Sequence, residues 1–225
     1  MSIYENVQRI LKDIPDDIKV IAAAKTRNID QVKESIDAGI CHIGENYVQE
    51  LEFIGENLPE EYRKKIKLHV IGHLQSNKMN KALKYCDSIQ TIDSIQTAEK
   101  INNKVPNFRS ELLDVLIEVN IANEPAKNGA KPDFAEIQSI AKAISKMENL
   151  RLEGLMTMGP WGHSAEELRP YFKQMKIFFD QLKNLNLVNT NIQDLSMGMS
   201  ESYHVAIEEG ATMVRLGRIL YGERE

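Results

Sequence analysis

Eight short runs of apolar and β-branched residues recur along the chain, and longer segments with a helical pattern separate them. Most of the runs are almost continuously apolar, which is typical of parallel strands covered on both faces. The predicted strands span residues 19–24, 41–44, 67–71, 88–92, 113–120, 153–158, 194–197 and 212–216. This alternation allows two architectures, a closed (β/α)8 barrel and an open doubly wound sheet.

The residues after the first predicted strand favour the barrel. An open dinucleotide-binding sheet would carry a glycine-rich turn there, whereas this chain has Ala24-Lys-Thr-Arg27. No linker rich in Pro, Gly or Ser divides the sequence. We therefore predict an α/β fold in which residues 1–225 form a single (β/α)8 TIM barrel, with an extra N-terminal helix over residues 2–12.

Three motifs predict where helices begin between the strands. The segments 93–96, 133–136 and 164–167 resemble capping boxes, in which two side chains satisfy free backbone N–H groups. After the third motif, apolar residues recur at three- and four-residue spacing and predict a helix face that packs on the sheet. The members of this stripe are Leu168, Phe172, Met175, Phe179 and Leu182.

Charge and composition exclude several classes of partner. The 28 Lys and Arg residues are outnumbered by 33 Asp and Glu residues, so a nucleic-acid partner is not expected. The first residues do not resemble a secretory signal, and the most apolar stretch, 20–24, is too short to cross a bilayer. Cys41 and Cys86 match no metal or redox spacing and are interpreted as reduced, partly buried thiols. These features predict a cytoplasmic protein that does not bind membranes.

Polar residues follow the predicted strands at their C-terminal ends, where such barrels build their sites. They include Lys25 after the first strand, Asn46 after the second, His73 after the third and Asn120 after the fifth. Further candidates lie at 158–160, 196–200 and 215–218. The N-terminal ends of the strands show no comparable collection, so we predict one functional rim.

The loops after the last two strands predict an anion site. Ser200 precedes a helical run over 201–209, which it would cap while offering a hydroxyl donor. Gly217 allows an anion to approach the backbone closely, and Arg218 adds another N–H group. Each residue alone is better interpreted as a helix cap or a turn. Their joint placement where barrels commonly bind phosphate favours a phosphate ligand.

Closure of the barrel would place Lys25 beside this anion site, because the first strand then neighbours the last. An amine next to the apolar run 20–24 loses its proton more readily, which suits attack on an aldehyde. A ligand with both a phosphate and an aldehyde is therefore expected. Pyridoxal 5'-phosphate fits this description, and so do the sugar phosphates of Schiff-base aldolases.

Other polar residues carry weaker signals. His69 and His73 lie on a strand and its following loop, without the glutamate of zinc proteases, so no metal site is predicted. We expect a structural role for His69 and a place near the pocket for His73. Glu45 and Glu118 are isolated carboxylates rather than an acid/base pair. Asn46 and Asn120 could bind a ligand or tie loops together.

Several motifs occur in an order that resembles the YggS/PROSC family of pyridoxal phosphate homeostasis proteins. The resemblance extends over essentially the whole chain. The motifs are Ala24-Lys-Thr26, Ile43-Gly-Glu-Asn46, the segment 69–78, Gly154-Leu-Met-Thr-Met-Gly-Pro160, Leu195-Ser-Met-Gly-Met-Ser200, Val214-Arg-Leu-Gly217 and Tyr221-Gly222. The resemblance implies a barrel like the N-terminal domain of alanine racemase, with pyridoxal phosphate held on Lys25 as a Schiff base.

The resemblance also implies roles for individual residues. Ser200, Gly217 and Arg218 would hold the phosphate, Arg215 would face the pyridine nitrogen, and Asn46, His73 and Ser196 would lie near the pocket. An arginine is always a donor and leaves the pyridine nitrogen unprotonated, which weakens the cofactor as an electron sink.

We therefore expect a protein of vitamin B6 and amino-acid homeostasis with no catalytic residues and no racemase activity. A racemase and an aldolase remain the alternatives. We also expect a monomer that passes the cofactor to apoenzymes dependent on pyridoxal phosphate.

Overall fold

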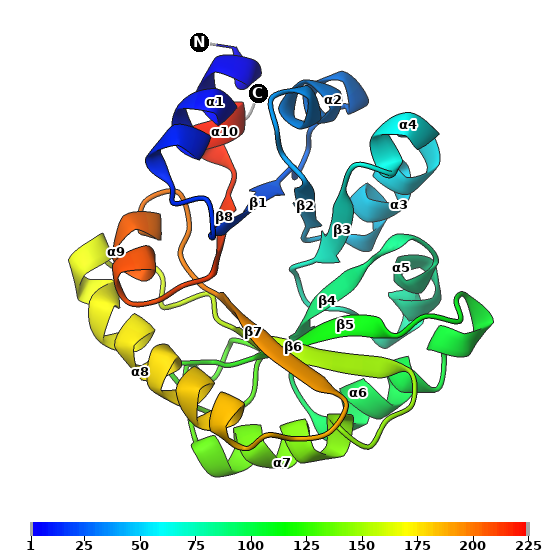
Figure 1. Cartoon of the computed structure of the whole chain (residues 1–225), viewed down its shortest axis with the longest axis vertical. Coiled ribbons are helices and arrows are strands. Elements are labelled where there is room, and N and C mark those ends of the chain that lie inside the picture. Colours follow the sequence, from blue (N-terminus) through cyan, green and yellow to red (C-terminus); the bar gives the residue numbers. More distant parts are fainter. Residues whose placement is uncertain (1, 224–225) are drawn as a thin grey trace.

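A computed structural model describes residues 2–223 and shows a closed barrel of eight parallel strands surrounded by helices (Figure 1). The strands are β1 (Lys19–Ala23), β2 (His42–Glu45), β3 (Lys67–Val70), β4 (Ser88–Ile92), β5 (Leu113–Glu118), β6 (Leu150–Met156), β7 (Thr190–Ser196) and β8 (Met213–Leu216). β1 pairs with β8 over four residues, so the sheet closes and the open alternative is excluded. The predicted TIM barrel is confirmed.

All eight predicted strands are present, but two begin earlier than predicted. β6 starts at Leu150 and β7 at Thr190, rather than at 153 and 194. Their first residues include Arg151 and Asn191, which interrupt the apolar pattern that marked the strands in the sequence.

Helices connect the strands and cover the outside of the barrel (Figure 1). They are α1 (Ile3–Asp13), α2 (Ile29–Asp37), α3 (Val48–Asn57), α4 (Glu60–Arg63), α5 (Met79–Tyr85), α6 (Ile95–Asn102), α7 (Phe134–Ile144), α8 (Ala165–Asn184), α9 (Tyr203–Glu208) and α10 (Arg218–Tyr221), with short 3₁₀ helices η1 (Ser76–Lys78) and η2 (Val105–Asn107). The extra N-terminal helix is α1. It lies against α10, where Asn6 donates a hydrogen bond to the carbonyl of Leu220 at 3.2 Å.

One of the three predicted capping boxes is confirmed, at Ser164 and Glu167 at the start of α8. The box at 93–96 is wrong, because Ser94 is the cap residue and accepts from the Thr97 N–H. The box at 133–136 is also wrong: Asp133 caps α7, while the Glu136 carboxylate accepts from the Lys131 N–H. The apolar stripe of α8 is buried as predicted.

The main apolar core forms a ring between the strands and the helices. Because side chains alternate along each strand, the opposite set points into the barrel interior. Only a small apolar cluster lies there, made of Ile21, Ile71 and Met213 with Ala23 packed against it. Much of the remaining interior is polar, whereas such barrels are commonly filled by branched aliphatic side chains.

Among residues 2–223, no helix combines the length and the apolar character that crossing a membrane requires. Both cysteines are free thiols. Cys86 is buried, but Cys41 is exposed, so the prediction of a partly buried Cys41 is wrong.

Candidate functional site

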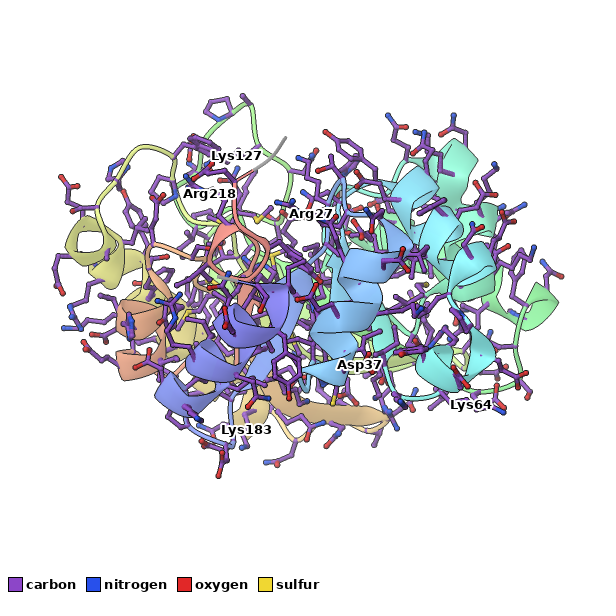
Figure 2. All side chains as sticks on the ribbon, turned by 90° about the horizontal axis from the view of Figure 1, so that it is seen from above. Arg27, Asp37, Lys64, Lys127, Lys183 and Arg218 are labelled. Carbon is purple, nitrogen blue, oxygen red and sulfur yellow. The ribbon has the colours of Figure 1, made fainter. Side chains whose placement is uncertain are left out.

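The C-terminal face of the barrel carries most of the predicted site residues. Lys25, Asn46 and His73 follow β1, β2 and β3, and Gly217 and Arg218 follow β8. Figure 2 shows Arg27, Lys127 and Arg218 toward one edge of the molecule, and Asp37, Lys64 and Lys183 toward the other. Arg27, Lys127 and Arg218 lie in or next to segments that follow strands, so their edge is the C-terminal face of the barrel. Asp37, Lys64 and Lys183 precede strands and mark the N-terminal end.

Lys25 sits on a strained turn at this face. Its side chain is partly buried, and its Nζ lies 5.1 Å from the centre of the Tyr47 ring. The next residue, Thr26, has a φ of 65°, a conformation that β-branched residues rarely adopt. Its N–H donates to Glu50 Oε1 at 3.1 Å. The carboxylate of Glu50 thus holds the turn that presents Lys25.

Glu45 lies buried near this turn, and neither of its carboxyl oxygens has a hydrogen-bond donor among the described residues. Burial raises its pKa well above the ordinary value, and the neighbouring Glu50 raises it further. Burial and the neighbouring carboxyl group both act against ionisation of Glu45, so the structure favours its protonated form. The sequence did not reveal this pair, since Glu45 and Glu50 come from a strand and a following helix.

The loops after β7 and β8 meet through a hydrogen bond from the Gly217 N–H to Ser200 Oγ at 3.3 Å. The prediction that Ser200 caps a helix starting at residue 201 is wrong. α9 starts at Tyr203, and it is Ser202 that accepts from the Met199 N–H. The shift frees the Ser200 hydroxyl to face the β8 loop.

Gly217 lies where these two loops meet. Its φ of −118° suits any residue, and an added Cβ would make only ordinary contacts with Ala23. Packing therefore does not require glycine here. Arg218 is exposed and forms an ion pair with Glu201.

Arg215 on β8 is buried, and its side chain reaches Ser196 on β7 and Thr157, which follows β6. Its Nη1 donates to Ser196 Oγ and its Nη2 to the carbonyl of Thr157, both at 2.7 Å. Burial lowers the pKa of Arg215 to about 10. Burial also raises the pKa of Glu118, which lies near Arg215, to about 7. No carboxylate among residues 2–223 forms an ion pair with Arg215.

The remaining candidates differ in their surroundings. Ser196 is fully buried, and its hydroxyl is occupied by Arg215 and Gln90, so it meets the face only through Arg215. Asn46 and His73 lie at the face, and their side chains form no hydrogen bond within the described chain. Asn120 ties its own loop together through the backbone of Glu124, as one of its two predicted roles requires.

The opposite, N-terminal end of the barrel holds a polar cavity of about 90 Å³. Its charged lining residues are Lys19, Lys67, Asp114, Arg151, Glu153 and Asp194. We call it the lower cavity. The prediction that this end carries no comparable collection is wrong. It failed because each strand contributes only one to three lining residues, which form no motif along the chain.

The charges of the lower cavity are paired, as in the contact of Lys19 with Asp194 at 2.7 Å. His42 and His69 also line this cavity, and His42 Nδ1 lies 3.0 Å from His69 Nε2. Burial, followed by the nearby Lys19 and Lys67, lowers the pKa of His42 to about 4. Burial likewise lowers the pKa of His69. Within residues 2–223, no three His, Cys, Asp or Glu side chains are placed to hold a metal ion.

Comparison with known proteins identifies the family. The family model for the alanine racemase N-terminal domain matches residues 1–225. The chain is 34% identical over 231 residues to the pyridoxal phosphate homeostasis protein of Pasteurella multocida, covering 99% of this chain and 95% of that protein. The chain belongs to the family of pyridoxal phosphate homeostasis proteins.

Solved structures agree with this membership. PipY of Synechococcus elongatus, solved with pyridoxal phosphate bound, is 28% identical with a TM-score of 0.85, and the match covers 98% of this chain and all of PipY. An alanine racemase from Clostridium difficile shares the fold at 20% identity, with a TM-score of 0.76. That match covers 99% of this chain and 57% of the racemase. Homeostasis proteins and the racemase therefore have the barrel in common.

Proposed function

We propose that this protein binds pyridoxal 5'-phosphate at the C-terminal face of its barrel and acts in pyridoxal phosphate and amino-acid homeostasis. One observation carries the proposal. Buried Arg215 forms no ion pair with a carboxylate among the described residues. It lies on β8, next to the strand β1 that leads to Lys25, and just before the β8 loop that is linked to Ser200. Arg215 already donates to Ser196 Oγ and the Thr157 carbonyl, but a buried guanidinium with no ion pair is stabilised by a further acceptor, which a ligand can supply. The name of the Pasteurella relative and the bound PipY structure support the same ligand.

The residues of the face fit the chemistry of this cofactor. The Ser200 hydroxyl and the backbone N–H groups of Gly217 and Arg218 are donors for a phosphate. The Lys25 amine is placed for the aldehyde. Arg215 is a donor for the pyridine nitrogen.

Asn46 and His73 would line the pocket, and Ser196 would act through Arg215. When bound, the cofactor supplies an aldehyde that condenses reversibly with primary amines.

Borohydride reduction of the loaded protein, followed by peptide mass mapping, tests the assignment of Lys25. We expect the pyridoxyl group on Lys25, and the yellow colour of the protein should be lost in Lys25→Ala but kept in Lys78→Ala. An adduct on Lys78 or Lys127 would contradict the assignment. A colourless purified protein that gains no colour with added pyridoxal phosphate would favour the aldolase alternative.

We further propose that the protein does not turn over amino acids as a racemase does. Racemisation requires bases on both sides of the reacting carbon and a cofactor that withdraws electrons strongly. The Lys25 amine lies 5.1 Å from the centre of the Tyr47 ring, so we expect both groups on one side of the reacting carbon and no base on the other. Arg215 cannot give a proton to the pyridine nitrogen, so the bound cofactor would withdraw electrons only weakly.

Incubation with L-alanine in heavy water tests this proposal. We expect neither rapid exchange of the α-proton nor accumulation of D-alanine. Rapid exchange together with accumulation of D-alanine, if both are lost in Lys25→Ala, would establish a racemase instead. The apoenzyme recipients, the cytoplasmic location and the monomeric state remain predictions from the sequence.

A further inference from the structure

Hydrogen bonds run without a break through the barrel interior, from Arg215 to the lower cavity. Arg215 Nη1 meets Ser196 Oγ at 2.7 Å, and Ser196 Oγ meets Gln90 Oε1 at 2.8 Å. Gln90 Nε2 then lies 3.2 Å from His69 Nδ1, and His69 Nε2 lies 3.0 Å from His42 Nδ1. Five side chains from β8, β7, β4, β3 and β2 thus form one series, which we call the interior chain.

Arg215 fixes the direction of the interior chain, because a guanidinium only donates hydrogen bonds. Ser196 accepts from Arg215 and passes its own hydrogen to Gln90 Oε1. The Gln90 amide then donates to His69 Nδ1, which leaves the His69 hydrogen on Nε2. His69 donates in turn to His42 Nδ1, so both imidazoles are neutral and carry their hydrogen on Nε2.

The reverse orientation of the Gln90 amide satisfies fewer groups. It would turn the amide nitrogen toward Ser196, whose hydroxyl hydrogen would then lose its acceptor. It would also turn the amide oxygen toward the sulfur of Met213, which lies 3.1 Å from the present nitrogen. The burial that lowers the pKa of both histidines agrees with neutral rings.

We propose that Gln90 and His69 are positioning residues of the cofactor site. Gln90 holds the Ser196 hydroxyl hydrogen away from Arg215, so that the Ser196 oxygen always presents a lone pair to the guanidinium. His69 fixes Gln90 in turn. The interior chain therefore sets the orientation of Arg215 from the side opposite the ligand and couples the cofactor site to the lower cavity. This inference rests on the proposed function.

Gln90→Met tests the coupling, because methionine has a similar length but neither donates nor accepts as an amide does. We expect the dissociation constant of pyridoxal phosphate to rise by about fivefold or more and its absorption band to shift, as Arg215 loses its fixed acceptor. Ile89→Ala is the matched control: Ile89 is equally buried on β4 but belongs to the apolar ring outside the barrel. This control should lose stability yet keep the wild-type affinity and band.

Nitrogen-15 spectra of the histidine rings test the interior chain in protein without cofactor. We expect the hydrogen of both His42 and His69 on Nε2 in the wild type, and a mixed His69 tautomer in Gln90→Met. Pyridoxal phosphate should shift the His69 signals of the wild type but not those of Gln90→Met.

Wild-type affinity and band in Gln90→Met would overturn the inference, and so would a His69 hydrogen on Nδ1 in the wild type. A wild type that binds no pyridoxal phosphate would overturn the proposed function instead, while the tautomers would still report on the interior chain.

Discussion

The hydroxyl of Ser200, in the loop after β7, contacts the loop after β8. Its oxygen accepts from the Gly217 N–H, and we assign the same group to the phosphate. Ser200→Ala should therefore weaken binding of pyridoxal phosphate by about 1 kcal/mol, roughly fivefold, as expected for one hydrogen bond. An equilibrium titration of the apoprotein measures this change.

Ser202→Ala provides the control for Ser200. Its hydroxyl accepts from the Met199 N–H at 3.2 Å in the same loop, but it is buried away from Gly217. This variant should lower the free energy of unfolding while leaving the cofactor affinity close to that of the wild type. Equal affinity losses in both variants would assign Ser200 only to the order of the loop.

At the scale of elements, β6 depends on Gly154 for its fit between β5 and β7. The register shifts on both sides of this strand, next to Gly154, which has a φ of 153°. A Cβ there would lie 1.8 Å from the carbonyl oxygen of Asp194 on β7. Backbone cannot yield as a flexible side chain can, so Gly154→Ala should cost about 3 kcal/mol or more of unfolding free energy.

Gly162→Ala isolates the conformational part of that cost in the same urea denaturation experiment. Gly162 has a φ of 77°, but an added Cβ would meet no atom within 4 Å. Its substitution should cost only about 1 kcal/mol, from backbone strain alone. A similar loss in both variants would show that β6 moves away from β7 without penalty.

The elements differ in how far the sequence predicts them. β5 is almost wholly buried, and the apolar run 115–117 marks it clearly in the sequence. The starts of β6 and β7 carry polar residues that belong to the lower cavity, and a strand that faces a polar interior loses its apolar signal. The C-terminal face was predictable because whole motifs build it.

Gln90 shows where sequence reasoning stops. It is a single amide within a buried strand, a signal visible in the sequence, but its partners come from three other strands. Only closure of the barrel brings them together.

Taken as a whole, the molecule keeps its main apolar core outside the barrel, and many polar groups lie within it beside the small cluster of Ile21, Ile71 and Met213. The interior is therefore held by hydrogen bonds and ion pairs, whose strength depends on protonation. His42 and His69 have lowered pKa values, while burial raises the pKa values of Glu45 and Glu118. These two sets make the stability respond to pH in opposite directions.

The contribution of His42 can be separated by comparing the wild type with His42→Asn, whose amide oxygen can still accept from His69. In the unfolded chain His42 titrates near its ordinary pKa of 6.5, and in the folded protein at about 4. Between these values the unfolded state binds more protons, so lowering the pH favours unfolding. The stability from neutral His42 is complete above pH 6.5 and is lost as the pH falls toward 4. The full difference corresponds to on the order of 3 kcal/mol.

The asparagine of the variant does not titrate, so the stability advantage of the wild type over His42→Asn should shrink by that order between pH 7 and pH 4. The opposing effect of Glu118, which is lost as the pH rises through about 7, is common to both proteins and cancels in the difference. Urea denaturation across this pH range measures the two curves. An advantage that stays constant with pH would mean that His42 keeps its ordinary pKa in the folded protein, and that Lys19, Lys67 and burial do not act on it as the structure indicates.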